Sequence, residues 1–356
     1  MLARLETMYL GYSLTPFGHH PRAWEHARNV EKLGFDALLA QVTAAESAGF
    51  DFVLLADRLG LRPAETPSSV ATPFEPTLLA SALASKTPRI GFVAAAAMAQ
   101  HEPYNLARRF ASLDLIGKGR LGWLAIPSGD PARDAEYFDV VTGLWDSYEP
   151  DAFLYDKAEG RFFDPEKMHV LNHKGVHFSV RGPLNVNPSP QGRPVVAQVF
   201  DGAGAPIAGD VLFLGARSVE DLTAMTEDAV QAVAACGKKR ADVRILANLV
   251  PVIGETAEAA DAASAALAFV EADRAEQPLS GIRIVSTADT IAGRMTELAA
   301  SLGLDGFTIL PPTLDMARLF VADVAPKLAR RGSVGEGETL RGRLSLPHLT
   351  HPAKEA

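Results

Sequence analysis

The chain has 356 residues, of which 47% are hydrophobic and 22% charged, and its formal net charge is −9. This length suits one large α/β domain, and the negative charge argues against nucleic acid and anionic membranes as partners, since both attract basic surfaces. One cysteine excludes an internal disulfide. With no secretory signal and no uninterrupted apolar run long enough for a membrane span, we expect a cytoplasmic protein.

From residue 8 onward, short β-type runs alternate with longer helical patterns. In the first half of the chain we expect strands over 8–14, 50–57, 89–99 and 120–127, with helices over 35–49, 75–87, 103–119 and 131–148. Residues 149–193 then break the alternation, because they hold few periodic apolar positions. A segment of this length is typical of a lid or binding loop, and residues 170–182 have the pattern of a short hairpin.

The alternation returns after this insertion, with strands expected over 194–200, 210–216, 243–254 and 306–312 and helices over 218–236, 256–272, 287–302 and 314–330. Eight strands in βα order predict an α/β fold, a (β/α)8 TIM barrel, with a shortened helix after the fifth strand. We expect a single domain over 1–330, with the insertion at about 149–193 before the fifth strand, and a C-terminal tail over 331–356. The alternative, a doubly wound sheet, would need G-x-G-x-x-G after the first strand, where the chain reads TPFGHHPRAW.

In a TIM barrel the chemistry lies where strands end and the following loops begin. His19 and His20 follow the first strand, Asp57 follows the second, and a Gly-Ala-Gly turn over 202–204 follows the fifth. Neighbouring residues of an extended chain point to opposite sides, so His19 and His20 are unsuited to share one metal ion. Each of them is a candidate for acid–base catalysis.

Other catalytic patterns are weaker. His169, His173 and His177 are spaced by four, which would align them only on a helix, and Gly175 with several β-formers argues against that helix. We therefore expect no metal site. The chain also lacks a G-x-S-x-G nucleophile motif and the paired carboxylates of a glycosidase. A cofactor enzyme is the more natural function for such a barrel, because a cofactor supplies chemistry that side chains lack.

Three segments carry a family resemblance: HEPYNLARRFASLDLIGKGRLGW (101–123), the block over 144–195 that begins LWDSYEPDAFLYD, and GETLRGRLSLP (337–347). In them the chain resembles the bacterial luciferase-like flavin-dependent monooxygenases, in the branch of the nitrilotriacetate, pristinamycin-synthase and dibenzothiophene-sulfone monooxygenases. The resemblance implies a TIM barrel, reduced FMN supplied by a separate flavin reductase, and reaction with O2 and a small organic substrate. It also implies a homodimer or heterodimer.

Carried over position by position, the resemblance implies a flavin site whose contacts are partly replaced. Asp57 matches an aspartate that the family places beside the flavin, whereas hydroxyl positions at the end of the third strand are here Ala95, Ala97 and Met98. A segment with a flavin-contacting histidine is missing. In the family a helix after the fifth strand takes the FMN phosphate at its N-terminus; here DGAGAPIAG (201–209) lacks Arg, Ser and Thr and is too short for a full helix.

The residues that the resemblance assigns to the cofactor are Asp57, Ala97, Gly202, Ala203 and Gly204. Two functions follow. The first is a two-component monooxygenase that depends on reduced FMN and O2. The second is a flavin-poor paralogue that acts as a non-catalytic partner subunit or binds an apolar ligand. A deazaflavin-dependent oxidoreductase ranks third, because the block over 144–195 is typical of the FMN branch.

Overall fold

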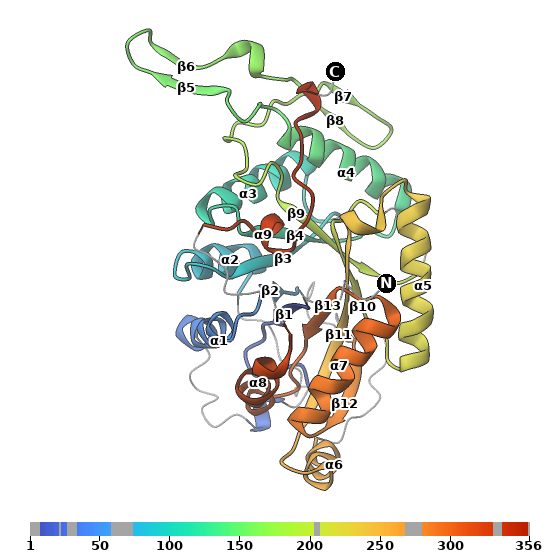
Figure 1. Cartoon of the computed structure of the whole chain (residues 1–356). Helices are drawn as coiled ribbons and strands as arrows, with labels where there is room; N and C mark the ends of the chain where they lie inside the picture. Colours follow the sequence, from blue (N-terminus) through green and yellow to red (C-terminus); the bar gives the residue numbers. More distant parts are fainter. Residues whose placement is uncertain are drawn as a thin grey trace.

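Eight parallel strands form a closed ring with helices around it (Figure 1). The computed structural model describes residues 8–20, 23–26, 34–57, 74–202, 207–267, 280–329 and 337–354. The ring runs β10-β9-β4-β3-β2-β1-β13-β11 and closes through the pairing of β10 with β11. Its strands are β1 (Tyr9–Ser13), β2 (Phe52–Leu55), β3 (Gly91–Ala97), β4 (Leu121–Ile126), β9 (Val195–Phe200), β10 (Val211–Leu214), β11 (Arg244–Ile253) and β13 (Gly306–Ile309). The predicted (β/α)8 barrel is confirmed.

The helices form the outer layer. They are α1 (Phe35–Ser47), α2 (Pro76–Ala84), α3 (Pro103–Ile116), α4 (Pro131–Trp145), α5 (Val219–Ala235), α6 (Ala257–Ala266), α7 (Ala288–Leu302) and α8 (Leu314–Leu319), while α9 (Leu340–Arg343) belongs to the tail. Pro103 and Pro131 occupy the first positions of α3 and α4, where the N–H that proline lacks is not needed. In the portion of the chain described above, no helix is long and apolar enough to cross a membrane.

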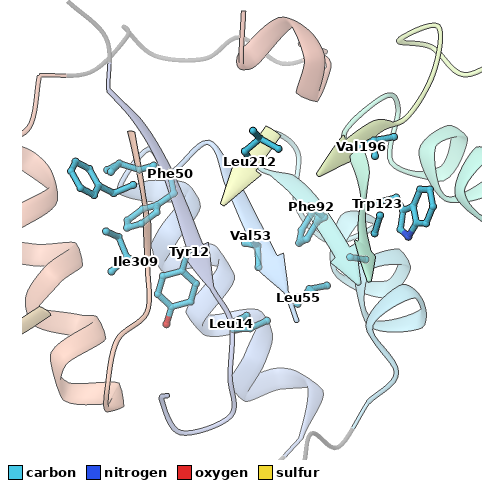
Figure 2. Close-up of a cluster of buried hydrophobic side chains, with 14 of the residues drawn as sticks. Tyr12, Leu14, Phe50, Val53, Leu55, Phe92, Trp123, Val196, Leu212 and Ile309 are labelled. Carbon is cyan, nitrogen blue, oxygen red and sulfur yellow. The ribbon is translucent and has the colours of Figure 1, made fainter. Parts of the chain in front are cut away.

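Strand alternation divides the core into two layers. Side chains such as Tyr12 and Trp123 point outward and pack with the helices, and Figure 2 shows part of this layer. Side chains of the opposite parity, such as Phe52 and Phe213, point into the barrel and pack against one another there. Both faces of the parallel strands are therefore buried, which explains their nearly continuous apolar sequences.

One strand of the sheet does not follow from the sequence patterns. β12 (Ile282–Ser286) pairs in parallel with β11 from Leu249 to Ile253, beyond the residues of β11 that pair with β10. It extends one side of the barrel mouth and is not part of the ring. Its five residues include the exposed Arg283 and carry little apolar periodicity. The helix expected over 314–330 is also shorter, since α8 ends at Leu319 and a π-helical turn over Phe320–Val324 follows it.

In the described residues, β9 connects to β10 without a helix. The return segment is held against the outer face of β9: the Gly209 N–H donates to Gln198 Oε1 at 2.7 Å. The Lys238 ammonium donates to the carbonyls of Ala208 and Gly209 at 2.7 and 2.9 Å. The shortening predicted after the fifth strand is therefore confirmed, and this fixed backbone segment takes the place of the helix.

The insertion before the fifth barrel strand contains two small hairpins. They are β5 (Phe153–Asp156) with β6 (Arg161–Phe163), and β7 (His173–Lys174) with β8 (Ser179–Val180). Figure 1 shows the β5–β6 hairpin projecting away from the barrel, and its Tyr155 and Phe162 side chains are exposed. The hairpin predicted over 170–182 is confirmed, whereas the role of the insertion as a lid stays a prediction.

Glu136 of α4 holds the β7–β8 hairpin through one carboxylate. It accepts hydrogen bonds from His173 Nε2 at 2.9 Å and from the N–H groups of Val176, His177 and Phe178 at 3.1, 2.9 and 2.8 Å. Burial alone would raise the pKa of Glu136, but these hydrogen bonds outweigh burial and lower the pKa to about 2. A depressed carboxyl pKa stabilises the fold above the unfolded value of 4.5, and this contribution is lost as the pH falls through about 2.

Replacing Glu136 by glutamine is expected to release the β7–β8 hairpin locally. The amide keeps one oxygen but turns an NH2 group toward backbone donors, so part of the four-bond arrangement is lost. Hydrogen–deuterium exchange at neutral pH should become about tenfold faster at residues 176–178 and stay unchanged in the barrel strands. Glu159→Gln, in the turn of the exposed β5–β6 hairpin, is the matched control. Unchanged exchange at 176–178 would show that the hairpin is held by other contacts.

The C-terminal tail closes the end of the barrel where the strands begin. Leu340 and Leu344 join the inner core. Arg244, the first residue of β11, donates to the Leu344 carbonyl at 2.7 Å, and the buried Arg341 forms an ion pair with Asp210 at 2.9 Å. The tail therefore seals this end, and the opposite end, at the carboxyl ends of the strands, is the one open to a ligand.

Candidate site at the barrel mouth

The carboxyl ends of the strands surround a partly open apolar surface. On the inner face of the barrel, Ala56, Ile126 and Val250 pack on the inner core but remain partly exposed. Val199, which follows the inward parity of β9, is 43% exposed. Inward side chains that are exposed mark where the barrel is open, and we call these four residues the mouth floor. Apolar side chains form most of the lining of small-molecule sites.

Three buried polar atoms on adjoining strands have no hydrogen-bond partner among the described residues: Ser13 Oγ, Thr308 Oγ1 and Asn248 Oδ1. The three residues are at most 1% exposed. Thr308 lies directly opposite Asn248 in the register of β13 with β11, and β1 carries Ser13 on the other side of β13. Buried polar groups in folded proteins are nearly always hydrogen-bonded, so these three atoms form an unsatisfied polar patch inside the barrel that is closed to solvent in this structure.

The loop after β1 is fixed to the end of β13. The N–H groups of His19 and His20 donate to the carbonyls of Pro311 and Pro312 at 2.8 and 3.0 Å. Gly18 has a φ of +120°, and a Cβ there would lie 2.4 Å from the Pro312 carbonyl oxygen. Only glycine fits this position. The resulting turn brings His19 and His20 beside the end of β13, at the carboxyl ends of the strands.

The two histidines have different surroundings. His19 Nε2 donates to the Ser13 carbonyl at 3.2 Å, so in the neutral ring Nδ1 keeps its lone pair. Burial lowers the pKa of His19 to about 4, and the ring is therefore neutral at physiological pH. His20 is buried, with 6% of its surface exposed. His19 is the better placed of the two for proton transfer.

Asp57 belongs to a charged cluster around His101. Its carboxylate, the Glu75 carboxylate and the Arg109 guanidinium all act electrostatically on His101, and Arg109 lies 3.9 Å from Glu75. Burial and then the Arg109 charge lower the pKa of His101, while the two carboxylates oppose them. Asp57 and His101, which follow β2 and β3, are thus within electrostatic reach of each other.

The remaining predicted cofactor residues lie on two strand ends. Ala97 ends β3 on the inner face and is 1% exposed, so a methyl group stands there in place of a hydroxyl. After β9, Gly202 is exposed with a φ of +75°, while Ala203 and Gly204 lie outside the described residues. The exposed Asp201 precedes this turn.

The histidines spaced by four do not converge. His169 Nε2 lies 3.2 Å from a Glu149 oxygen, and His173 pairs with Glu136, while strand β7 replaces the helix that would align them. Over the described ranges of the chain, no group of three or more His, Cys, Asp or Glu side chains is placed to hold a metal ion.

Sequence reasoning did not identify Ser13, Thr308, Asn248 or Val199. The first three are polar residues within apolar strands, in YLGYS, GFTI and RILANLV. A single polar residue in an apolar strand indicates a candidate site residue once it is known which residues of the strand point inward. Val199 has no such signal, because its exposure depends on what neighbouring loops leave uncovered.

A family model described as luciferase-like monooxygenase matches residues 13–310, from the end of β1 to just past β13. The chain is 32% identical to N-acetyl-S-(2-succino)cysteine monooxygenase of Bacillus subtilis (strain 168), over 97% of this chain and 98% of that protein. The alignment runs over 433 positions, more than the 356 residues present here. The Bacillus protein therefore contains segments that this chain lacks, consistent with the shortened connection after β9.

Two solved structures resemble the whole chain. EDTA monooxygenase from Chelativorans sp. BNC1 is 27% identical, with a TM-score of 0.83 over 96% of this chain and 99% of that chain. A riboflavin lyase, solved with modified FMN and its substrate riboflavin, is 26% identical, with a TM-score of 0.82 over 98% of this chain and 99% of that one. Both matches extend over nearly all of the barrel, the insertion and the tail.

Proposed function

The chain belongs to the luciferase-like monooxygenase family and is an oxidoreductase, and from this premise we propose a two-component reaction. The protein takes reduced FMN from a separate flavin reductase and uses O2 to oxygenate a small organic substrate. When bound, reduced flavin reacts with O2, so that one oxygen atom enters the substrate, the other leaves as water and the flavin is oxidised. The observation that carries the proposal is the family match over residues 13–310, together with the partly exposed apolar side chains at the carboxyl ends of the strands.

The mouth suits the flavin ring better than the flavin phosphate. The ring is planar and largely apolar, which matches the partly exposed mouth floor. The mouth-floor side chains would pack against the ring and exclude water from it. The phosphate lacks its usual place, since no helix follows β9 in the described residues and Asp201 stands at that turn. The described residues therefore fit the ring and do not fit the phosphate.

We propose His19 and the Asp57–His101 cluster as the acid–base groups. His19 is neutral at physiological pH because burial lowers its pKa to about 4, so it can accept a proton at Nδ1 or orient a substrate oxygen. In the cluster, the imidazole of His101 can exchange protons with a ligand. Burial and the Arg109 charge lower its pKa, against the opposing influence of the Glu75 and Asp57 carboxylates. Both lie at strand ends, where barrel enzymes carry their chemistry.

The flavin reductase is proposed as a transient partner, and a dimer of two copies or with a homologous chain as the assembly. The exposed Tyr155 and Phe162 of the β5–β6 hairpin support such a contact, since aromatic residues are enriched at interfaces. The alternative, a non-catalytic flavin-poor paralogue, is not favoured, because the matched Bacillus and Chelativorans proteins are named as monooxygenases.

The test is an anaerobic titration followed by turnover. The full chain is titrated with reduced FMN, then mixed with a flavin reductase, NADH, 18O2 and a panel of small organic compounds. We expect saturable flavin binding and one 18O atom in a product, with a reductase-only mixture as the control for free-flavin oxidation. No flavin binding up to about millimolar concentration, a binding free energy of about −4 kcal/mol, would contradict the proposal.

A further inference from the structure

The helices that begin at the barrel mouth carry carboxylates at their N-termini. Each of the eight helices α1 to α8, within the described residues, has an acid at its cap or in its first turn: Asp36, Glu75, Glu102, Asp130, Glu220, Glu258, Asp289 and Asp315. A helix N-terminus otherwise attracts anions through its dipole and its unbonded N–H groups. We infer that this protein holds flavin by the ring alone, so that reduced riboflavin binds as well as reduced FMN. This inference rests on the proposed function.

The donors that a phosphate would use at α4 and α5 are already bonded within the chain. At α4 the Asp130 carboxylate accepts the N–H groups of Ala132 and Arg133 at 3.1 and 3.2 Å. At α5 the Asp221 carboxylate accepts the N–H of Arg217 at 3.0 Å, and Asp221 donates its own N–H to the cap, Ser218. A phosphate at α4 would have to displace the Asp130 carboxylate, and a phosphate at α5 would meet the negative charge of Asp221.

Of the arginines near these helix starts, Arg133 has its guanidinium engaged, and Arg217 has a carboxylate bound to its backbone N–H. The Arg133 guanidinium donates to the Met98 carbonyl at 3.3 Å and lies 4.9 Å from the centre of the Phe178 ring. Arg217 is exposed but starts the segment that the Asp221 carboxylate binds. The turn after β9 adds Asp201 and, by its sequence, no cation or hydroxyl over 201–209. Charge at the described part of the mouth therefore works against a phosphate.

The ring has a separate and positive basis for binding. The mouth floor leaves Val199 43% exposed on the inner face. Packing the flavin ring on the mouth floor removes apolar surface from water. None of these contacts involves the ribityl phosphate, the one group that distinguishes FMN from riboflavin.

The test compares the two reduced flavins on the full chain by anaerobic fluorescence titration. We expect dissociation constants within about threefold of each other, with any difference in favour of riboflavin, because like charges repel. A preference for FMN of about thirtyfold or more would overturn the inference while leaving the proposed function intact. Binding of neither flavin would overturn the proposed function itself, and the inference with it.

Two further measurements sharpen the result. Raising the NaCl concentration to about 0.5 M should leave FMN affinity unchanged or improve it, because salt screens the repulsion. A severalfold weakening by salt would instead indicate cations that bind the phosphate. Arg217→Ala should leave both affinities unchanged, and a selective loss of FMN binding in that variant would overturn the inference by identifying Arg217 as a phosphate contact.

Discussion

Replacing Asp114 by alanine is expected to lower the free energy of unfolding by about 3–5 kcal/mol, because each buried donor left without an acceptor costs about 1–3 kcal/mol. Asp114 is fully buried in α3. Its carboxylate accepts the Leu121 N–H at 2.9 Å, the Gln191 side-chain amide at 2.8 Å and the Ser189 hydroxyl. The Gln191 oxygen in turn accepts the N–H of Arg341. The alanine variant leaves three buried donors without their acceptor, at a junction of α3, β4, the insertion and the tail.

Urea unfolding followed by tryptophan fluorescence measures this loss, and Asp114→Asn, which keeps the shape, is the control. The pH dependence adds a signature. Burial raises the pKa of Asp114 from 3.8 to about 6, although the hydrogen bonds around it oppose that shift. The folded state thus holds this proton more tightly, so the charged carboxylate opposes folding above pH 6 and this effect fades as the pH falls from about 6 to 3.8.

The wild type should therefore gain stability relative to Asp114→Asn when the pH is lowered from 7 to 5. A loss below about 1 kcal/mol for the alanine variant would be the size of an ordinary hydrogen bond and would contradict the role of Asp114 as a junction. Parallel pH profiles of the wild type and the asparagine variant would contradict the raised pKa.

The second large effect is expected at the mouth floor. Val199→Trp should weaken the binding of reduced flavin by about 100-fold or more, because the indole would occupy the space above the floor that the ring needs. Val199 is 43% exposed, so the larger side chain has room outward and the unfolding free energy should change by less than about 0.5 kcal/mol. Anaerobic titration with reduced FMN measures the loss of binding.

Val230→Trp, on the outer helix α5, is the matched control. Val230 is 37% exposed, so the same substitution is made on an apolar side chain of similar exposure far from the strand ends. Its flavin affinity should equal that of the wild type. Wild-type affinity in Val199→Trp would place the flavin somewhere other than the mouth floor.

The barrel could be predicted because each of its strands leaves its own pattern in the sequence. Parallel strands buried on both faces leave short apolar runs, such as FVLL before Asp57, and these runs alternate with amphipathic helices. β12 was not predicted, because a strand at the rim is not buried on both faces and lacks a continuous apolar run. In the described residues it pairs with β11 alone and includes the exposed Arg283. The shortened connection after β9 was readable too, since a segment with Pro206 and so few residues cannot form a full helix.

The site was predictable only where chain order settles position. His19 and Asp57 follow β1 and β2 as the sequence predicts, and their roles in a site stay a prediction. Which residues of β1 and β11 point inward, among them Ser13 and Asn248, was known only from the structure. The hydrogen bonds by which Glu136 holds the β7–β8 hairpin, and those of Asp114 to β4 and the insertion, could not be predicted from the sequence. Their partners lie 37–42 and up to 77 residues away along the chain, and no local pattern encodes such pairs.

The seal formed by the tail has a consequence for biosynthesis. Protein synthesis delivers the chain from its first strand onward, yet β1 pairs with β13 and the inner core includes Leu340 and Leu344. The barrel therefore cannot complete its interior while those residues are still inside the ribosome. Until these residues have left the ribosome, the nascent chain exposes unpaired apolar strands. Such strands are prone to aggregate and are the kind of surface that chaperones protect. We expect ribosome-bound chains stalled before residue 340 to remain protease-sensitive, and released chains to become resistant.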